Sequence, residues 1–237
     1  MPMSVGADLP SEFLIPSDTW TREYAGAHAG VLALRDAANP AHSAALQRRK
    51  EELEKELRSR FAGMDRAALR AHPVLRAYEE HYRRFDKTYH LQLQLESIIF
   101  KGKPIPSSAA LVEAMFMAEM DSLLLTAGHD LDAVRAPLRL DVASGTENYL
   151  LLRGAMQAPK AGDMMISDGE GILSSIVYGP DQRTQIRAET TGVVFTVYAP
   201  AGIGASAIEA HLAGIRENVR LIAPSARVEI LKVHSAG

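Results

Sequence analysis

The 237-residue sequence contains no cysteine, which excludes disulfide bonds and every reaction that needs a thiolate. Long hydrophobic runs are also missing, because the longest, such as residues 114–118, fall far short of the ~18 apolar residues of a membrane span. The first residues lack the basic stretch and apolar core of a secretory signal peptide. These absences predict a cytoplasmic protein with no membrane partner.

Motifs for metal, nucleotide and serine-hydrolase chemistry are missing too. The eight histidines include no pair three or four residues apart, the spacing that places two metal ligands on one helix face. The sequence has no G-x-S-x-G elbow and no phosphate-binding loop with lysine. We therefore expect no metal and no cofactor.

Positive charge is scarce except in one segment. The formal net charge of −3 argues against a general nucleic-acid coat protein. Residues 66–103, however, carry eight basic and four acidic side chains. This excess suits weak docking of a phosphate-bearing partner, and it equally suits ordinary solvated helix faces. If a nucleic acid binds, its phosphates are expected to contact Arg83, Arg84, Lys87, Lys101 and Lys103.

The first 103 residues are expected to be mostly helical after a loop-rich start over residues 1–29 and a short strand over 31–34. Ser43 is placed to cap a helix over 43–61. Further helices are expected to begin after Asp65 and at Pro73, a residue tolerated in the first helical turn.

Apolar side chains also indicate which helices are buried. The helix that begins at Pro73 carries an aromatic and apolar stripe, which favours a core face over a base-stacking platform. A further helix, opened by Ser107 or Ser108 and extending to about Leu125, is apolar almost all round. Because Glu113 and Glu119 lie on that buried helix, their carboxylates must be paired, hydrogen-bonded or neutralised.

The remaining sequence alternates short apolar runs with glycine-rich turns, which predicts strands. Ser206 and Glu209 form a capping box for a helix that extends to about Arg220, before a final strand. The expected strands cover residues 138–142, 149–152, 164–167, 172–178, 193–198 and 227–233. We predict an α+β fold: a mixed or antiparallel sheet core flanked by helices, with a helical N-terminal part. It forms a single unit over 1–237, divided into a mostly helical part (1–103) and a strand-rich core (104–237).

Polar residues of different chemistry are concentrated between two of these buried strands. Asp181, Gln182, Arg183 and Thr184 follow one another directly. An acid, an amide, a guanidinium and a hydroxyl side by side are more than a simple surface turn needs. Arg183 could clamp a carboxylate or phosphate, or pair with Asp130 or Asp181 to join two loops. Thr184 could orient a water molecule or satisfy a strand end.

This segment also resembles a known family. Residues 181–184 with 189–195 are similar to the D-x-R-T and E-T-x-x-V-x-F segments of the editing module of the phenylalanyl-tRNA synthetase beta chain, in its free-standing form. Residues 128–132 look like the family's G-x-D-L-D corner, and residues 101–106 resemble its G-K-x-L-P turn. The shared order of such pieces extends over roughly two hundred residues.

The resemblance implies hydrolysis of the ester that joins a wrong amino acid to tRNA. The expected partners are then the acceptor end of tRNA and its amino-acid moiety, and the reaction needs no cofactor because the ester is already activated. Glu113, His129 and Thr184 become the candidates for catalysis. Asp181, Gln182, Arg183 and Asp130 become the candidates for substrate binding, in one cavity with the 128–132 corner and the Glu113 helix.

The chain departs from the family pattern at several of these positions. Ser107-Ser108 replaces an asparagine-proline, and the following helix carries Glu113 and Phe116 where aspartate and asparagine are common. A trans-acting editing hydrolase is therefore one expectation. The alternatives are a non-catalytic module that binds tRNA or an amino-acid-like small molecule, and a protein-interaction domain on the same scaffold.

Overall fold

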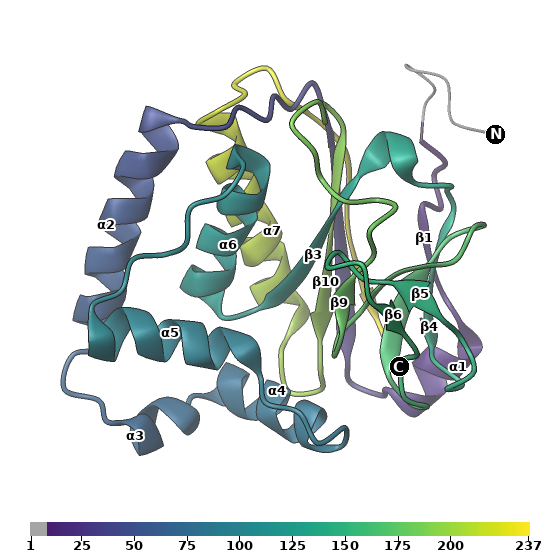
Figure 1. Cartoon of the computed structure of the whole chain (residues 1–237). Coiled ribbons are helices and arrows are strands. Elements are labelled where there is room, and N and C mark those ends of the chain that lie inside the picture. The colour runs from purple at the N-terminus through teal and green to yellow at the C-terminus, as the bar shows by residue number, and fades with distance from the viewer. Residues whose placement is uncertain (1–8) are drawn as a thin grey trace.

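The computed structural model describes residues 9–237 and confirms the predicted α+β fold, with one mixed and one antiparallel sheet, and a further two-stranded antiparallel sheet, flanked by helices (Figure 1). The α-helices are α1 (Asp18–Glu23), α2 (Ala44–Arg60), α3 (Arg66–Arg70), α4 (Pro73–Arg83), α5 (His90–Lys101), α6 (Ala110–Ser122) and α7 (Ala205–Arg220). The strands are β1 (Leu14–Pro16), β2 (His28–Arg35), β3 (Leu125–Asp130), β4 (Leu138–Val142), β5 (Tyr149–Leu150), β6 (Met156–Gln157), β7 (Met164–Ser167), β8 (Ile172–Ser175), β9 (Gly179–Pro180), β10 (Val193–Ala199) and β11 (Arg227–Ser235). A 3-10 turn, η1 (Leu131–Ala133), follows β3.

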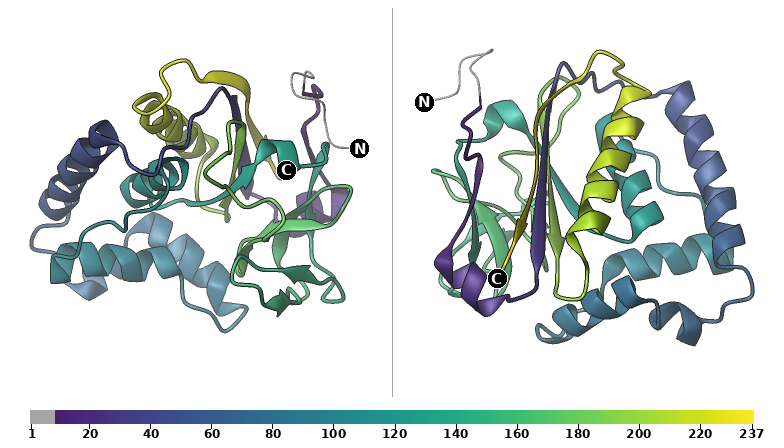
Figure 2. Two further views of the ribbon diagram at one scale, coloured as in Figure 1. Left: turned by 45° about the horizontal axis from the view of Figure 1, so that its top comes forward. Right: turned by 180° about the vertical axis from the view of Figure 1, so that it is seen from behind.

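The four-stranded sheet at the centre has the order β11-β2-β10-β3, and all its neighbouring strands are antiparallel. Every residue of β10 is buried, because α6 and α7 cover one face of the sheet and the second sheet lies on the other (Figure 2). Gly30 in β2 allows α7 to pack closely, since a Cβ atom there would lie 2.5 Å from Cγ2 of Ile208. Strand β2 comes from the N-terminal part, so both parts of the chain build this sheet.

The second sheet has the order β1-β4-β7-β8-β9 and is mixed, because β1 runs parallel to β4 while the other pairs are antiparallel. Helix α1 docks on it through Trp20, which is fully buried and donates from Nε1 to Sδ of Met164 at 3.3 Å. Strand β9 is the edge of this sheet, as β3 is of the first. The two edges are neighbours, and this junction holds the candidate sites.

Helices α4 and α5 lie below α6 and α7 in the view of Figure 1. The aromatic stripe of α4 is core, as predicted: Tyr78 donates to the Tyr198 carbonyl of β10, and Tyr82 donates to the Ile176 carbonyl at 2.5 Å. Tyr89, just before α5, donates to the Leu123 carbonyl at 3.0 Å. These buried hydroxyls join the helical part to both sheets, because each satisfies a backbone carbonyl that would otherwise lack a partner.

Several predicted boundaries are confirmed. Ser43 caps α2 by accepting from the Leu46 amide, Asp65 caps α3 by accepting from the Ala68 amide, and α4 begins at Pro73. The predicted strands all correspond to strands, although those expected over 149–152 and 172–178 are shorter.

Other expectations are wrong. The helix expected to reach Leu125 ends at Ser122, because Leu123 adopts the left-handed conformation, and the apolar run continues as the unpredicted strand β3. Neither Ser107 nor Ser108 caps that helix. The capping box at Ser206 is also wrong, because α7 starts at Ala205 after Gly204 with no side-chain cap.

The N-terminal region is more regular than the sequence predicts, since β1 and α1 occupy part of the segment expected to be loop. The expectation of no signal peptide concerns residues 1–8, which lie outside the described part of the chain. Among residues 9–237, no helix has both the length and the apolar character to cross a membrane.

Candidate functional site

Four of the predicted site residues, His129, Asp181, Arg183 and Thr184, meet where the loop between β9 and β10 contacts β3. His129 of β3 lies with Nδ1 2.7 Å from Oγ1 of Thr184, and the Thr184 hydroxyl donates to Oδ1 of Asp181. A backbone hydrogen bond joins the same two segments, because the Asp130 amide donates to the Thr184 carbonyl at 2.7 Å. We call His129, Asp168, Asp181, Arg183 and Thr184 the loop cluster.

Arg183 completes the loop cluster with ion pairs inside the protein. Its guanidinium lies 2.9 Å from Oδ1 of Asp168, whose side chain is fully buried, and 3.3 Å from Oε2 of Glu170. It also donates to the Ala133 carbonyl at 2.9 Å. The fork of Arg183 therefore joins the β9–β10 loop to the turns after β3 and β7.

Asp130 is engaged in the same way. Its Oδ2 accepts from the Thr190 hydroxyl at 2.6 Å, and its Oδ1 accepts from the Asp132 amide at 3.0 Å. Oδ1 therefore caps the turn in which Asp130 lies, and Oδ2 joins that turn to the loop between β9 and β10.

Burial removes the middle of the loop cluster from solvent. His129 and Thr184 have no exposed surface. Burial, with the nearby Arg183 charge, lowers the pKa of His129 to about 3, so its imidazole is neutral at physiological pH. Burial also raises the pKa of Asp181. Of the predicted site residues, Asp181, Gln182 and Arg183 border a polar groove of about 510 Å³ beside β5 and β8.

Glu113 does not join this group. Its carboxylate forms a buried ion pair with Lys50 of α2, which also lies 2.8 Å from Oγ of Ser107. Neither the polar groove nor the apolar cavity described below includes Glu113 in its lining. The expected grouping of Glu113 with Asp181, Arg183 and Thr184 is therefore absent, because Lys50 neutralises the carboxylate within the helical layer.

The five predicted phosphate contacts fall into two groups. Arg83, Arg84 and Lys87 are exposed at the end of α4 and in the following turn. Lys101 and Lys103 are exposed at the far end of α5, a helix of 12 residues and so ~18 Å long. Only the first group approaches a cavity, because Nζ of Lys87 lies 5.6 Å from the centre of the Tyr178 ring.

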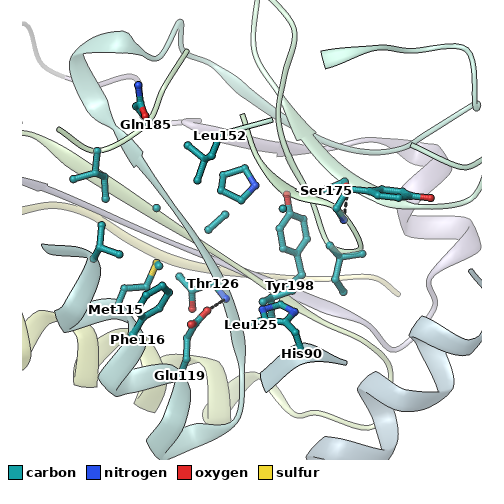
Figure 3. A pocket seen from close by; sticks show the side chains of 18 of the residues that line it. His90, Met115, Phe116, Glu119, Leu125, Thr126, Leu152, Ser175, Gln185 and Tyr198 are labelled. Atoms are coloured by element: carbon teal, nitrogen blue, oxygen red, sulfur yellow. Dashed lines mark hydrogen bonds between the residues drawn. The ribbon is translucent and has the colours of Figure 1, made fainter. Parts of the chain in front are cut away.

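That cavity, of about 490 Å³, lies between α6 and the neighbouring edges of the two sheets (Figure 3). Helix α6 contributes Met115, Phe116 and Glu119, strand β3 contributes residues 125–128, and the β8–β9 segment contributes residues 175–180. Most of its wall is apolar. Gly128 keeps it open, because a Cβ atom there would lie 2.9 Å from Cδ1 of Ile186.

The polar part of this wall is one corner. Glu119 is 2% exposed, and its Oε1 accepts from the Thr126 amide at 2.7 Å (Figure 3). Burial raises the pKa of Glu119 to about 8, against the opposing effect of that hydrogen bond. Thr126 in turn lies with Oγ1 2.6 Å from Nε2 of His211, whose Nδ1 lies 2.7 Å from Oγ of Ser122. We call Glu119 and Thr126 the polar corner.

No family model matches this chain, and no curated protein matches it. Among solved structures it is similar to an N-terminal fragment of the phenylalanyl-tRNA synthetase beta subunit from Pyrococcus horikoshii, with 14% identity and a TM-score of 0.43. The match covers 54% of this chain and 43% of that one, so it spans less than half of the fragment.

The polar corner was not among the predicted site residues. One signal for it exists in the sequence, because Glu119 is an acid on a helix that is otherwise apolar almost all round. Thr126 and His211 have no such signal: Thr126 lies on β3, a strand that the sequence does not predict, and His211 lies 85 residues from Thr126 in the chain. Among residues 9–237, no three His, Asp or Glu side chains are gathered as metal ligands would be.

Proposed function

We propose that the protein binds an amino-acid-like small molecule, free or as the aminoacyl end of a tRNA, in the cavity between α6, β3 and β9. The observation that carries this proposal is the cavity itself: about 490 Å³, walled mainly by apolar side chains, with a buried carboxyl group at one corner. A concave apolar site with few polar groups is the usual form of a small-molecule site. Its volume suits an amino acid with an aliphatic or aromatic side chain.

The loop cluster is a weaker candidate for binding or chemistry. The Thr184 hydroxyl is engaged by Nδ1 of His129 and by Asp181, and neither Thr184 nor His129 reaches solvent. Nε2 of His129 is buried and has no hydrogen-bond partner among residues 9–237. The guanidinium of Arg183 is likewise held by Asp168 and Glu170. A ligand there would have to displace protein contacts that are already made.

The second candidate function is hydrolysis of an aminoacyl ester on a mischarged tRNA, in trans. One observation favours it: Glu119 lines the cavity and has a pKa of about 8, close to the working pH of a general acid or base. Such a group could move a proton to or from water beside the ester. The exposed Arg83, Arg84 and Lys87 would contact phosphates near the acceptor end, and Lys87 lies against the Tyr178 ring of the cavity wall.

Two assays on the purified chain test these proposals together. Binding of aminoacyl methyl esters and of charged tRNAs is measured by calorimetry, and deacylation is followed on a panel of correctly and wrongly charged tRNAs. The variant Glu119→Gln is compared with Glu209→Gln, which changes an exposed glutamate of α7 in the same way.

Binding without turnover, lost in Glu119→Gln alone, supports the binding module. Metal-independent deacylation that falls ~10²-fold or more in Glu119→Gln supports the hydrolase. If the protein neither binds these esters nor cleaves them, both proposals are wrong.

A further inference from the structure

The polar corner has hydrogen-bonding capacity that the protein does not use. Within residues 9–237, Oε1 is the only carboxylate oxygen of Glu119 that has a hydrogen-bond partner, the Thr126 amide. The second oxygen is unpaired on a side chain that is 2% exposed and borders the cavity. This oxygen has no partner among residues 9–237 and is not sealed off by protein atoms, so its position in a cavity wall points to a group supplied from outside.

The hydroxyl of Thr126 is oriented by a chain of contacts behind it. The Ser122 hydroxyl donates to the Ala118 carbonyl at 2.9 Å, so it accepts from Nδ1–H of His211. The Ala118 carbonyl also faces the His211 ring and raises its pKa, although burial dominates and lowers that pKa to about 4. With the proton on Nδ1, Nε2 is the acceptor, and Thr126 donates to it at 2.6 Å. The Thr126 oxygen is then left with lone pairs only.

When Glu119 is ionised, the polar corner is therefore a pair of acceptors with no cation of its own. No lysine or arginine of residues 9–237 lines the cavity. The titratable groups that face Glu119 include Tyr78 and Tyr82 from α4 and Tyr89 before α5, whose pKa values burial raises. The neutral His211 from α7 lies behind Thr126. His90 at the start of α5 borders the same cavity. Glu119 also lies one turn from the C-terminal end of α6, where the helix dipole favours positive charge.

We propose that the polar corner binds the primary ammonium group of the ligand, with Glu119 and Thr126 as acceptors and with His211 and Ser122 as positioning residues. The proposal rests on the proposed function and deepens it, because it names the ligand class as molecules that join an ammonium group to an apolar body. With Glu119 ionised, a ligand carboxylate would face only acceptors here and would be repelled. The ammonium group supplies both the missing charge and the missing donors.

The test compares ligands that differ only in the amine. Methyl esters of L-amino acids with aliphatic and aromatic side chains are each paired with the des-amino ester, for example L-phenylalanine methyl ester with methyl 3-phenylpropanoate. In the wild-type protein we expect the amine to tighten binding at least about tenfold. This comparison needs no substitution, so it does not depend on whether a variant folds.

Variants then assign the preference to the polar corner. Glu119→Gln keeps an acceptor for the Thr126 amide but removes the charge, and it should reduce the preference for the amine below about threefold. Thr126→Val should reduce it in part, and Thr126→Ser should restore it, because serine keeps the hydroxyl that His211 orients. Glu209→Gln should leave it unchanged.

The outcomes separate this inference from the proposed function. If amine and des-amino esters bind equally well, the polar corner does not recognise an ammonium group, while ligand binding in the cavity stands. An amine preference that survives Glu119→Gln also overturns the inference. If no ester of either series binds, the inference and the proposed function are both contradicted.

Discussion

The loop cluster and the polar corner lie at the two ends of the same strand, β3. They differ in whether their polar groups have partners within the protein. In the loop cluster, Thr184, Asp181 and Arg183 are occupied by internal hydrogen bonds and ion pairs. In the polar corner, Glu119 has one oxygen paired and the other facing a cavity. The polar side chains of the loop cluster thus bind one another and stabilise the fold, whereas the second carboxylate oxygen of Glu119 remains available to a ligand.

The largest expected loss of stability follows from substitution of Glu113, another carboxylate that is paired inside the protein. Glu113→Gln leaves the Lys50 ammonium buried without its counter-charge, so we expect the free energy of unfolding to fall by about 3–5 kcal/mol. Urea unfolding measures the loss. The double variant Lys50→Met/Glu113→Leu, which removes both charges, should recover most of it. A Glu113→Gln protein of unchanged stability would show that the Glu113 carboxylate does not stabilise the fold.

A smaller loss is expected in the loop cluster itself. Thr184→Val keeps the size of the side chain but leaves His129 and Asp181 without their shared partner, at a cost of about 2 kcal/mol. Thr184→Ser is the matched control, since it retains the hydroxyl. Ester affinity of the folded Thr184→Val protein should equal that of the wild type. If Thr184→Val lowers ester affinity and leaves the free energy of unfolding unchanged, the loop cluster binds the ligand and the assignment of the two regions is wrong.

The pH dependence of stability tests the polar corner without any ligand. The pKa of Glu119 is about 8 in the folded protein against an ordinary value of 4.5, so the folded state binds more protons and the free energy of unfolding falls as pH rises between these values. His129 and His211 have lowered pKa values and cost stability only below pH 6.5. Burial raises the pKa of Asp163 to about 7, which adds a slope of the same sign.

The substitution Glu119→Gln separates these contributions. Between pH 6.5 and 8 the wild type should lose about 2 kcal/mol relative to Glu119→Gln, because only the wild type ionises a carboxyl group at this corner. Urea unfolding of both proteins across this range gives the difference. Parallel pH profiles would mean that Glu119 is already ionised or is solvated in the folded protein.

The smallest expected effect concerns the basic residues. If tRNA binds with its acceptor end at the cavity, Lys87→Glu should weaken binding several-fold and reduce the salt slope by about one. Lys101→Glu, at the other end of α5, is the control and should do less. Filter binding at several salt concentrations distinguishes them. Equal effects at the two ends would show that phosphate contacts do not centre on the cavity.

The fold was largely readable from the sequence because its signals are local. Caps at Ser43 and Asp65, the proline at 73 and the apolar runs between glycine turns each act within a few residues. Strand β3 was missed because the apolar run of α6 continues into it, and the break depends on the backbone of Leu123, which has no sequence signature.

The candidate site was readable only in part, because its partners are distant in the chain. The sequence grouped residues 181–184 with the 128–132 corner, where His129 lies, but could not show that Asp168 would pair with Arg183. Likewise, the acid at Glu119 was visible on a buried helix, whereas its neighbour Thr126 and the His211 behind it come together only through packing of β3 and α7.

The most direct test of the central claim is a crystal structure of the protein with a non-hydrolysable amide analogue of a 3′-aminoacyl-adenosine. The account predicts density for the amino-acid part between α6, β3 and β9, with its amine within hydrogen-bond distance of the Glu119 carboxylate. Density in the polar groove beside Asp181 and Arg183, with the polar corner empty, would contradict it.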